Sequence, residues 1–446
     1  MLANYPDLAH VHEHNEELGR EVRTNRLESR LRKGSDRHPF RRGVVLLTLA
    51  LGAALVAVTA LTGVAPKAEA FPTAETVVFS SNRTAGPGVD NPTRDYEIFK
   101  MNPDGTGVRQ LTFNKGDDYE PILSPDGTRI AFTHRTVEAT EQGGFEIWVV
   151  NTRDGSGIKN LTANGRGVDD YGPAFSPGSK RITYTSFGEQ TSNPEGDNEI
   201  YLMSAVDGSG KKNLTDNGVE VAGASAVEDY CSVFSPDGKR MVYVSSGEQT
   251  SNPEGDSEVY RLNISDGSMQ KNLTYNGADV RDYYPAVSPD GQWISYTSDG
   301  EQTSNPEGDW EVYRMNALDG AGQTNLSNNG LDVDDGKPVF SPGGARIVYE
   351  SGGKQPSNAE GDGEIYRMNA QDGMGQVNLS NNGAGVNDSY ADFYVNGTKI
   401  VYQTYGKQTS NPEGDFEMYR MDTGDGSGKK NLTDNRVADD GTNPGS

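Results

Sequence analysis

The sequence predicts an all-β fold: a β-propeller of seven four-stranded blades, preceded by one transmembrane or signal helix. A unit of about 50 residues recurs seven times, each unit contains four strand-like runs, and 22 consecutive uncharged residues stand near the amino terminus. Four short antiparallel strands make one propeller blade. Six and eight blades are the alternatives, because the units at the two ends of the repeat region are incomplete.

The amino-terminal end is expected to anchor the chain in a membrane. Residues 1–42 form a polar tail with nine Lys and Arg, and residues 43–64 are apolar enough and long enough to cross a bilayer. The positive-inside rule then places the tail in the bacterial cytoplasm and the rest of the chain outside. Residues 65–75 form a linker that contains a signal-peptidase-like Ala68-Glu69-Ala70. We expect a retained anchor, with secretion after cleavage following Ala70 as the alternative.

The composition argues against nucleic acid as a partner. Acidic residues outnumber basic residues by 65 to 40 and give a net charge of −25, whereas phosphate binding needs a basic surface. Cations and basic protein surfaces are the favoured partners. The single cysteine, Cys231, cannot form an internal disulfide, and we expect it to be a small core residue.

The repeat unit can be read strand by strand. In the copy around residue 300, the four strand-like runs are 285–288, 293–298, 310–316 and 323–326. A Ser-Pro-Asp-Gly turn at 288–291 joins the first two runs, because proline fixes φ and glycine accepts a positive φ. An Asp-Gly pair joins the third and fourth runs in every copy and predicts a second hairpin. The outermost run carries an Asn/Gln-Leu-Thr/Ser triplet that begins at Gln110, Asn160, Asn213, Asn272, Asn325, Asn378 and Asn431.

The propeller is expected to occupy residues 76–446. The third-strand motif Glu-(Ile/Val/Met)-(Tyr/Phe/Trp) occurs seven times, whereas the first-strand motif is complete six times. The repeat begins at Thr76 in the second run of a unit, and residues 439–444 restart a first run. Joining these two partial units would close the ring and remove exposed sheet edges.

The motifs Ser-Pro-Asp-Gly, (Arg/Lys)-Ile-x-(Phe/Tyr)-x-Ser, Glu-Ile-Tyr-x-Met-Asn, Asp-Gly-x-Gly and Asn-Leu-Thr follow one another along the repeat, with substitutions in individual copies. In this order they resemble the WD40-like repeat (PD40) of the TolB family, over about residues 75–444. The resemblance implies a TolB-like propeller, a fold that also occurs in prolyl-oligopeptidase relatives and some lyases and therefore does not fix a function. TolB carries a separate α/β domain before its propeller, and nothing of that size stands between Val64 and Thr76. A role in the Tol-Pal system is therefore not expected.

One set of acidic residues precedes the innermost strands: Asp118, Asp170, Asp229, Asp282, Asp335, Asp388 and Asp440. A loop that enters the innermost strand lies near one mouth of the central channel, so these carboxylates could form a ring. Such a ring would repel itself unless a cation or a basic segment occupied it. The alternative interpretation is that each aspartate caps its own turn by accepting backbone N–H bonds.

A second acidic set lies in the long loop Gly-Glu-Gln-Thr-Ser-Asn-Pro-Glu-Gly-Asp between the second and third strands. The loop is identical at 188–197, 247–256 and 300–309, and looser at 353–362 and 406–415. Its alternating carboxylates are oxygen ligands of the kind that Ca²⁺ prefers, although the spacing does not match an EF-hand. The candidate calcium ligands are Glu195, Asp197, Glu254, Asp256, Glu307 and Asp309. Solvated hairpins without metal are the alternative.

The function predicted from these patterns is a non-catalytic extracytoplasmic propeller that binds or scaffolds a protein, a peptide or an envelope polysaccharide. His134 is the one histidine after the apolar stretch, and no Gly-x-Ser-x-Gly elbow accompanies it, so catalysis is disfavoured. A secreted enzyme that cleaves glycosides or peptides with carboxylates is one alternative. A cation-stabilised surface component is another. No cofactor is required, and calcium is the candidate ion.

Overall fold

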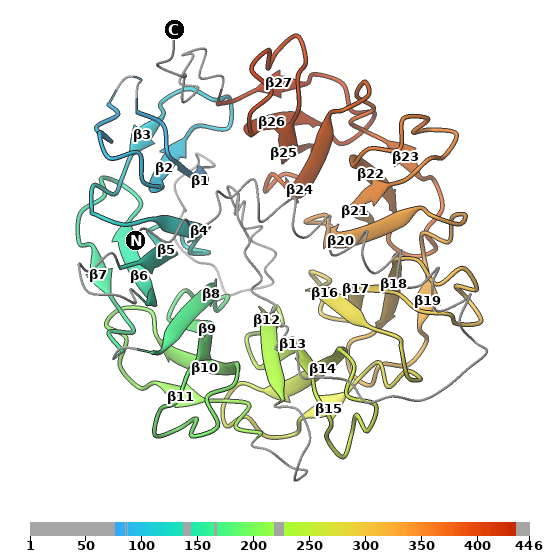
Figure 1. Cartoon of the computed structure of the whole chain (residues 1–446), viewed down its shortest axis with the longest axis horizontal. Helices are drawn as coiled ribbons and strands as arrows, with labels where there is room; N and C mark the ends of the chain where they lie inside the picture. Colours follow the sequence, from blue (N-terminus) through green and yellow to red (C-terminus); the bar gives the residue numbers. More distant parts are fainter. Residues whose placement is uncertain are drawn as a thin grey trace, which may run out of the picture. The chain divides into compact units, whose positions relative to one another are not determined.

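The computed structural model describes residues 76–84, 86, 88–136, 144–164, 167–217 and 227–433. The described strands lie within the unit Ala54–Ser446 and form seven antiparallel sheets arranged around a ring (Figure 1). The first sheet has three described strands and each of the other six has four. The predicted all-β propeller of seven blades is therefore confirmed. The predicted tail 1–42, apolar span 43–64 and linker 65–75 lie outside the described residues.

Each blade runs from the centre of the ring to its rim in chain order. The innermost strands are β4 (Asp118–Leu123), β8 (Asp169–Phe175), β12 (Glu228–Phe234), β16 (Asp282–Val287), β20 (Asp334–Phe340) and β24 (Asn387–Phe393). The second strands are β1 (Val77–Ser81), β5 (Arg129–Arg135), β9 (Arg181–Phe187), β13 (Arg240–Ser246), β17 (Trp293–Ser298), β21 (Arg346–Gly352) and β25 (Lys399–Tyr405).

The outer half of each blade holds the third-strand motif and the Asn-Leu-Thr/Ser triplet. The third strands are β2 (Glu97–Met101), β6 (Phe145–Asn151), β10 (Glu199–Ser204), β14 (Glu258–Asn263), β18 (Glu311–Asn316), β22 (Glu364–Asn369) and β26 (Glu417–Asp422). The outermost strands are β3 (Arg109–Gln110), β7 (Lys159–Asn160), β11 (Lys212–Asn213), β15 (Lys271–Asn272), β19 (Thr324–Asn325), β23 (Val377–Asn378) and β27 (Lys430–Asn431). These strands have only two residues each, which limits the unpaired edge at the rim.

The hydrophobic core lies between neighbouring blades, because both faces of each sheet are apolar. Val348 and Ile365 of the sixth blade, for example, form one buried cluster with Ile400 and Tyr402 of the seventh. The Asp-Gly turns also pack against the preceding blade. A Cβ on Gly208 would stand 2.0 Å from the carbonyl oxygen of Leu161, and the residue has a φ of +72°, so this turn requires glycine.

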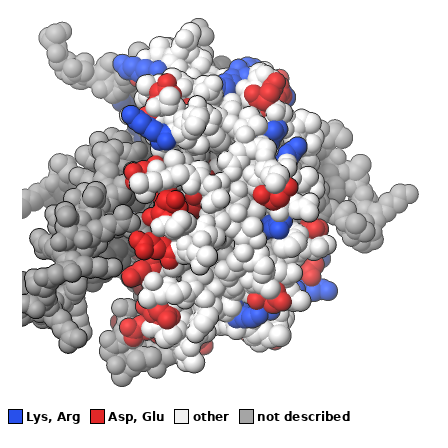
Figure 2. Space-filling model, turned by 90° about the vertical axis from the view of Figure 1, so that its right-hand side faces the viewer, with Lys and Arg blue, Asp and Glu red and all other residues white. Residues whose placement is uncertain are grey.

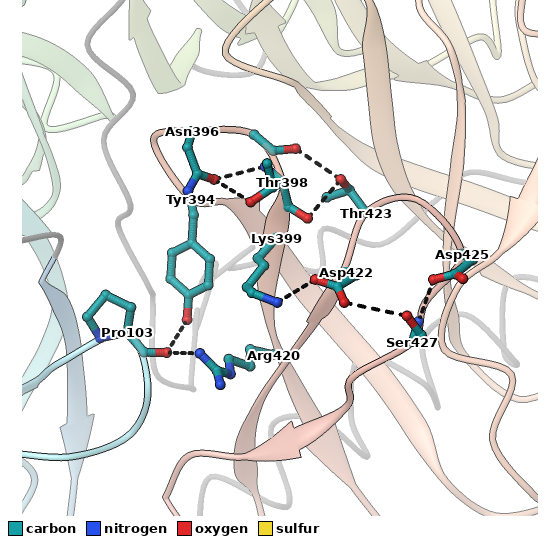
Figure 3. A network of polar contacts seen from close by, with 11 residues as sticks. Pro103, Tyr394, Asn396, Thr398, Lys399, Arg420, Asp422, Thr423, Asp425 and Ser427 are labelled. Carbon is teal, nitrogen blue, oxygen red and sulfur yellow. Dashed lines mark hydrogen bonds and ion pairs between the residues drawn. The ribbon is translucent and has the colours of Figure 1, made fainter.

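The first and seventh blades close the ring by packing against each other. Val77 and Phe99 share a buried cluster with Val401 and Leu432. The carbonyl oxygen of Pro103 accepts hydrogen bonds from the Tyr394 hydroxyl at 3.0 Å and from Arg420 at 3.2 Å (Figure 3). The predicted strand clasp from residues 439–444 lies outside the described residues and stays a prediction.

The part of the chain that the structure describes contains no helix that is long and apolar enough to cross a membrane.

Candidate binding site

The six described aspartates of the predicted ring are buried inside the innermost strands. Asp118, Asp170, Asp229, Asp282, Asp335 and Asp388 are at most 2% exposed. They lie within the strands and not in the preceding loops: Asp282 pairs with Ser298, for example, although the sequence suggested a strand beginning at 285. The strand begins earlier because a bulge after Tyr283 shifts the register and lets the ladder resume beyond Pro285. Asp440 lies outside the described residues.

These aspartates are bonded to the preceding blade, and we call them the seam aspartates. We call the contact between two neighbouring blades at such an aspartate a seam. In the seam of Asp282, Asn276 donates its side-chain amide to Asp282 at 2.6 Å and its backbone N–H to Glu258 at 2.9 Å. The Thr274 hydroxyl, from the outer triplet, also donates to Glu258. An asparagine bonds the seam aspartate in the same way in all six described seams. The bonds therefore run between side chains of two blades, and not to the backbone of a single turn.

Burial raises the pKa of the seam carboxyls. It raises the pKa of Asp229 and Asp335 to about 7, and burial together with the neighbouring Glu364 raises the pKa of Asp388 to about 8. Burial and the facing Asp229 raise the pKa of Glu199 to about 9. The seams of Asp229, Asp335 and Asp388 consequently retain a proton near neutral pH, because two close carboxylates cannot both ionise away from water.

His134 belongs to one of these seams. Its Nδ1 lies 2.6 Å from an Asp118 carboxylate oxygen, and its ring packs against Trp148 with centroids 4.6 Å apart. The imidazole faces Asp118 in the ladder, at the position that Ser298 and Thr404 occupy opposite their own seam aspartates. His134 is 4% exposed, and both of these contacts lie within the second blade, so it serves the packing of that blade.

A different set of residues lines the inner edge of the ring, at the bulge two positions after each seam aspartate. These bulge residues are Glu120, Gly172, Cys231, Tyr284, Lys337 and Tyr390, and all six have φ between 50° and 62°. They comprise five residue types at six positions, with Tyr occurring twice, although the residues around them repeat. Cys231 is half-buried at one of these positions and is therefore not the core residue that the sequence suggested.

The preceding blade fixes the bulge backbone. The N–H of Tyr390 donates to Glu350 at 2.7 Å, the N–H of Lys337 donates to Thr297 at 3.1 Å, and the N–H of Gly172 donates to Glu120 at 3.0 Å. Residues held at positive φ are strained unless their surroundings determine the conformation, and these bonds supply that constraint. The backbones of Tyr390, Lys337 and Gly172 are thus held in a fixed geometry.

Lys337 is the centre of the contacts among the bulge residues. Its ammonium lies 3.8 Å from the ring centroid of Tyr390, 5.9 Å from that of Tyr284 and 3.0 Å from a carboxylate oxygen of Glu350. Burial opposes the charge, but Glu350 and the two tyrosines outweigh it and raise the pKa of Lys337. A permanent cation therefore stands between two aromatic rings on the inner edge of the ring.

The sequence did not single out the bulge residues. The signal that could have identified them is variation: each lies two residues after an aspartate that recurs in every copy, yet each has a different chemistry from most of its counterparts.

The second-to-third-strand loops are ordered by repeated hydrogen bonds. In the loop of the third blade, the Asn193 amide donates to the Asp197 carbonyl at 2.7 Å, Gly196 donates to Asn193 at 3.0 Å, and Ser192 bonds the Tyr201 hydroxyl at 2.8 Å. The same bonds recur in the loops of the next four blades. Asp197 and Asp309 are buried, Asp256 and Glu307 are half-buried, and Glu195 and Glu254 are exposed.

The charge is distributed unequally around the propeller. The first three copies of the loop each carry two Glu and one Asp, whereas the turns at the opposite ends of the strands mix Asp with Lys and Arg. Figure 2 shows acidic side chains gathered along one edge of the molecule, and acidic and basic side chains alternating along the other. Within the described ranges, no group of three or more His, Cys, Asp or Glu residues is close enough to hold a metal. Any cation in a loop would therefore need backbone, amide or water oxygens beside a carboxylate.

Comparisons of sequence place this chain among known propellers. Residues 141–358 match the family described as the TolB beta propeller domain, PD40. The Protein TolB homolog of Chlorobium chlorochromatii is 30% identical over 158 residues, which cover 35% of this chain and 30% of that protein. Dipeptidyl-peptidase 5 of Porphyromonas gingivalis is 26% identical over 254 residues, which cover 49% of this chain and 35% of that protein. The matches thus span about a third of the length of these curated relatives.

Solved structures show the same fold at low identity. A puromycin-hydrolyzing peptidase of Mycobacterium tuberculosis aligns with a TM-score of 0.54 and 16% identity, over 85% of this chain and 53% of that chain. An oligogalacturonate lyase from Vibrio parahaemolyticus aligns with a TM-score of 0.54 and 13% identity, over 77% of this chain and 85% of that chain. The chain is a seven-bladed β-propeller, and its residues 141–358 match the PD40 family of TolB beta propeller domains.

Proposed function

We propose that this propeller is a non-catalytic binding module that holds a polypeptide segment of a partner protein against its inner edge. The observation that carries the proposal is the set of bulge residues. Structural positions repeat from blade to blade, whereas these six positions carry five residue types, and the five non-glycine residues are held at positive φ. Backbone strain of this kind is found preferentially at binding and catalytic sites.

A polypeptide suits the chemistry of the bulge residues. Tyr284 and Tyr390 offer large amphipathic surfaces that lose little side-chain entropy on binding, as tyrosines do at protein interfaces. Lys337 adds a half-buried basic group between the two tyrosines, whereas Glu120 is buried and bonded to Thr133 and Gly172. A peptide can match this mixture of aromatic and basic contacts with its own side chains and backbone. An envelope polysaccharide that stacks on the tyrosines is the second ligand class to test.

The contacts of the ionisable groups favour binding over catalysis. His134 is engaged with Asp118 and Trp148 inside a seam. The carboxyls with the most raised pKa, such as Glu199 and Asp388, are buried between blades and do not face a substrate. Relatives that are named as peptidases share the propeller with this chain, and their activity belongs to those proteins. Cleavage of a glycoside or a peptide by carboxylates is therefore the alternative that an activity screen must test.

The proposed location is the extracytoplasmic side of the bacterial cell membrane. The support is the apolar stretch 43–64, its basic flank and the acidic chain that follows it. A retained anchor would hold the propeller at the membrane, and cleavage after Ala70 would release it. In both cases the partner would be a component of the cell envelope.

Capture of partners from native envelope extract tests this proposal. Detergent-solubilised full chain is compared with a variant that carries Tyr284→Ala, Lys337→Ala and Tyr390→Ala. The matched control carries Val206→Ala, Leu318→Ala and Met374→Ala, which change three exposed side chains in the Asp-Gly turns. We expect one protein to be held by the wild type and the control and lost by the bulge variant. A synthetic peptide from that protein should then bind with at least a tenfold difference between the two variants.

Three other results would count against the proposal. Equal capture by both variants would place the site away from the inner edge. Selective capture of a polysaccharide would replace the polypeptide as the ligand class. Release of cleaved products from the extract would favour the enzyme alternative.

A further inference from the structure

Three of the ordered loops end in an aspartate whose carboxylate is buried without a bond. Both side-chain oxygens of Asp197, Asp256 and Asp309 are inaccessible to solvent, and none of the six accepts a hydrogen bond from the described part of the chain. Asp197 is 2% exposed and Asp309 is 8% exposed. These loop aspartates come from the third, fourth and fifth blades, whose loops are identical in sequence.

An ionised carboxylate in this environment needs a counter-charge. Leaving a buried acceptor unpaired destabilises the folded state, and more so when the acceptor is charged. Unpaired buried charges in a native protein commonly mark an ion or an ordered water.

In two other loops of the same protein the carboxylate of the corresponding aspartate accepts at least one hydrogen bond, although Oδ1 of Asp362 is also buried without a partner in the described chain. In the first blade, Asp95 occupies the equivalent position, because the Asn91 amide donates to its backbone carbonyl at 2.7 Å, as Asn193 does to Asp197. Its carboxylate accepts hydrogen bonds from the Thr93 hydroxyl and from the N–H of Gly116 at 3.3 Å. In the sixth blade, one carboxylate oxygen of Asp362 accepts the N–H of Gly385 at 3.0 Å.

A charge difference accompanies this difference in bonding. The sixth and seventh blades carry Lys354 and Lys407 at the second loop position, where the three identical loops carry Glu189, Glu248 and Glu301. The side chain at this position packs over the glycine that precedes the aspartate: Cγ of Glu189 would lie 3.1 Å from a Cβ on Gly196, and Cγ of Lys354 would lie 2.8 Å from one on Gly361. We call the loops of the sixth and seventh blades the lysine loops. They carry a positive charge at the position where the three identical loops carry a negative charge.

We infer that the loops of the third, fourth and fifth blades each bind one divalent cation, with Ca²⁺ as the best fit and the loop aspartate as its carboxylate ligand. Ca²⁺ accepts carboxylate, amide and backbone oxygens together with water, in flexible geometry. The exposed Glu195 and Glu254 and the half-buried Glu307 would attract the ion without contacting it directly. One carboxylate per site is a low charge count, which points to affinities of about 10⁻⁴ to 10⁻³ M, as in extracellular modules.

Titration of the full chain with Ca²⁺, followed by calorimetry and by competition against Tb³⁺ luminescence, tests this inference. We expect three sites per chain in the wild type. A variant with Asp197→Asn, Asp256→Asn and Asp309→Asn should lose all three. A control with Glu195→Gln, Glu254→Gln and Glu307→Gln has the same change in net charge and should keep three sites, each weakened less than tenfold.

A second variant uses the lysine loops as its template. Glu189→Lys, Glu248→Lys and Glu301→Lys should abolish Ca²⁺ binding while the melting temperature without Ca²⁺ stays within a few degrees of the wild type, because two loops of the chain already fold with lysine there. Absence of binding by the wild type at millimolar Ca²⁺ would overturn the inference. Equal loss in the Asn and Gln variants would also overturn it, since that result would show attraction to surface charge alone. Neither outcome bears on the inner-edge site, because the capture experiment changes other residues.

Discussion

The seam aspartates and the loop aspartates are both buried and both recur with the blades, yet they differ in their partners. Every described seam aspartate accepts at least one hydrogen bond from an asparagine of the preceding blade. Asp197, Asp256 and Asp309 accept none from the described residues. A buried acid that is bonded to its neighbours stabilises the fold, whereas one without a bond needs something from outside the chain. Burial and repetition alone therefore do not separate structural from ligand-binding acids.

The largest expected effect is the loss of a seam aspartate. Asp229→Ala should lower the free energy of unfolding by about 3 kcal/mol, because it leaves the Asn217 amide unsatisfied between two blades. Denaturation of the full chain in urea, followed by tryptophan fluorescence, measures the change. Asp229→Asn is the matched control and should cost less, because it keeps the shape of the side chain and because the pKa of Asp229, raised to about 7, leaves the group about half protonated at neutral pH. An equal cost for both substitutions would contradict the protonated seam.

The second effect is a loss of stability as the pH rises. Burial raises the pKa of Asp170, Asp229 and Asp335 to about 7 and that of Asp388 to about 8, whereas unfolded carboxyls titrate near pH 4. The folded state therefore binds more protons than the unfolded state between these values, and its stability must fall as the pH rises from about 4 to about 8. Melting temperatures across this range should show the decline. A melting temperature that rises between about pH 4 and about pH 8 would contradict the raised pKa of the seam carboxyls.

The third effect concerns the one seam that contains a histidine. His134→Ser should cost only about 1 kcal/mol, because Ser298 stands opposite the seam aspartate in the same register in the fifth blade. Thermal melting of the two proteins compares them directly. A loss comparable to that of Asp229→Ala would mean that the second blade depends on its histidine in a way that the other seams do not.

The smallest effect is expected at a loop aspartate in the absence of metal. Asp309→Asn in chelator should leave the melting temperature unchanged or slightly raised, because it removes a buried charge that has no partner in the described chain. With millimolar Ca²⁺ the order should reverse, since only the wild type gains stability from the ion. A clear drop in melting temperature in chelator would show that Asp309 supports the loop by itself.

Much of the fold could be predicted because each turn carries its own local signal. The Asp-Gly pairs and Ser-Pro-Asp-Gly turns locate the hairpins, and the third-strand motif beginning at Glu97 counts the blades correctly. The start of the innermost strand was predicted three residues late in the copy around residue 300. A proline normally ends a central strand, and nothing local shows that the bulge at Tyr284 and Pro285 lets the ladder resume.

The site was harder to predict because its residues meet across blades. The seam aspartates were expected at the mouth of the channel, where sequence order alone places them. Their true surroundings depend on Asn276 and Glu258 of the preceding blade, and the packing of two sheets brings these groups together. The bulge residues were missed for the opposite reason, since a motif search detects residues that recur in every copy and passes over a position that holds Lys337 in one blade and Tyr390 in the next.

The contact of Pro103 with Tyr394 has a consequence for how the protein is made. It joins residues 291 positions apart, whereas the hydrogen bond from Gly172 to Glu120 in an ordinary seam joins residues 52 apart. As the ribosome releases the chain, each new blade can pack on the one before it, but the outer flank of the first blade waits for the seventh. Val77 and Phe99 therefore face solvent for most of the time needed for translation. We expect chaperones to engage the nascent chain at this flank, and premature termination before the seventh blade to yield an aggregating product.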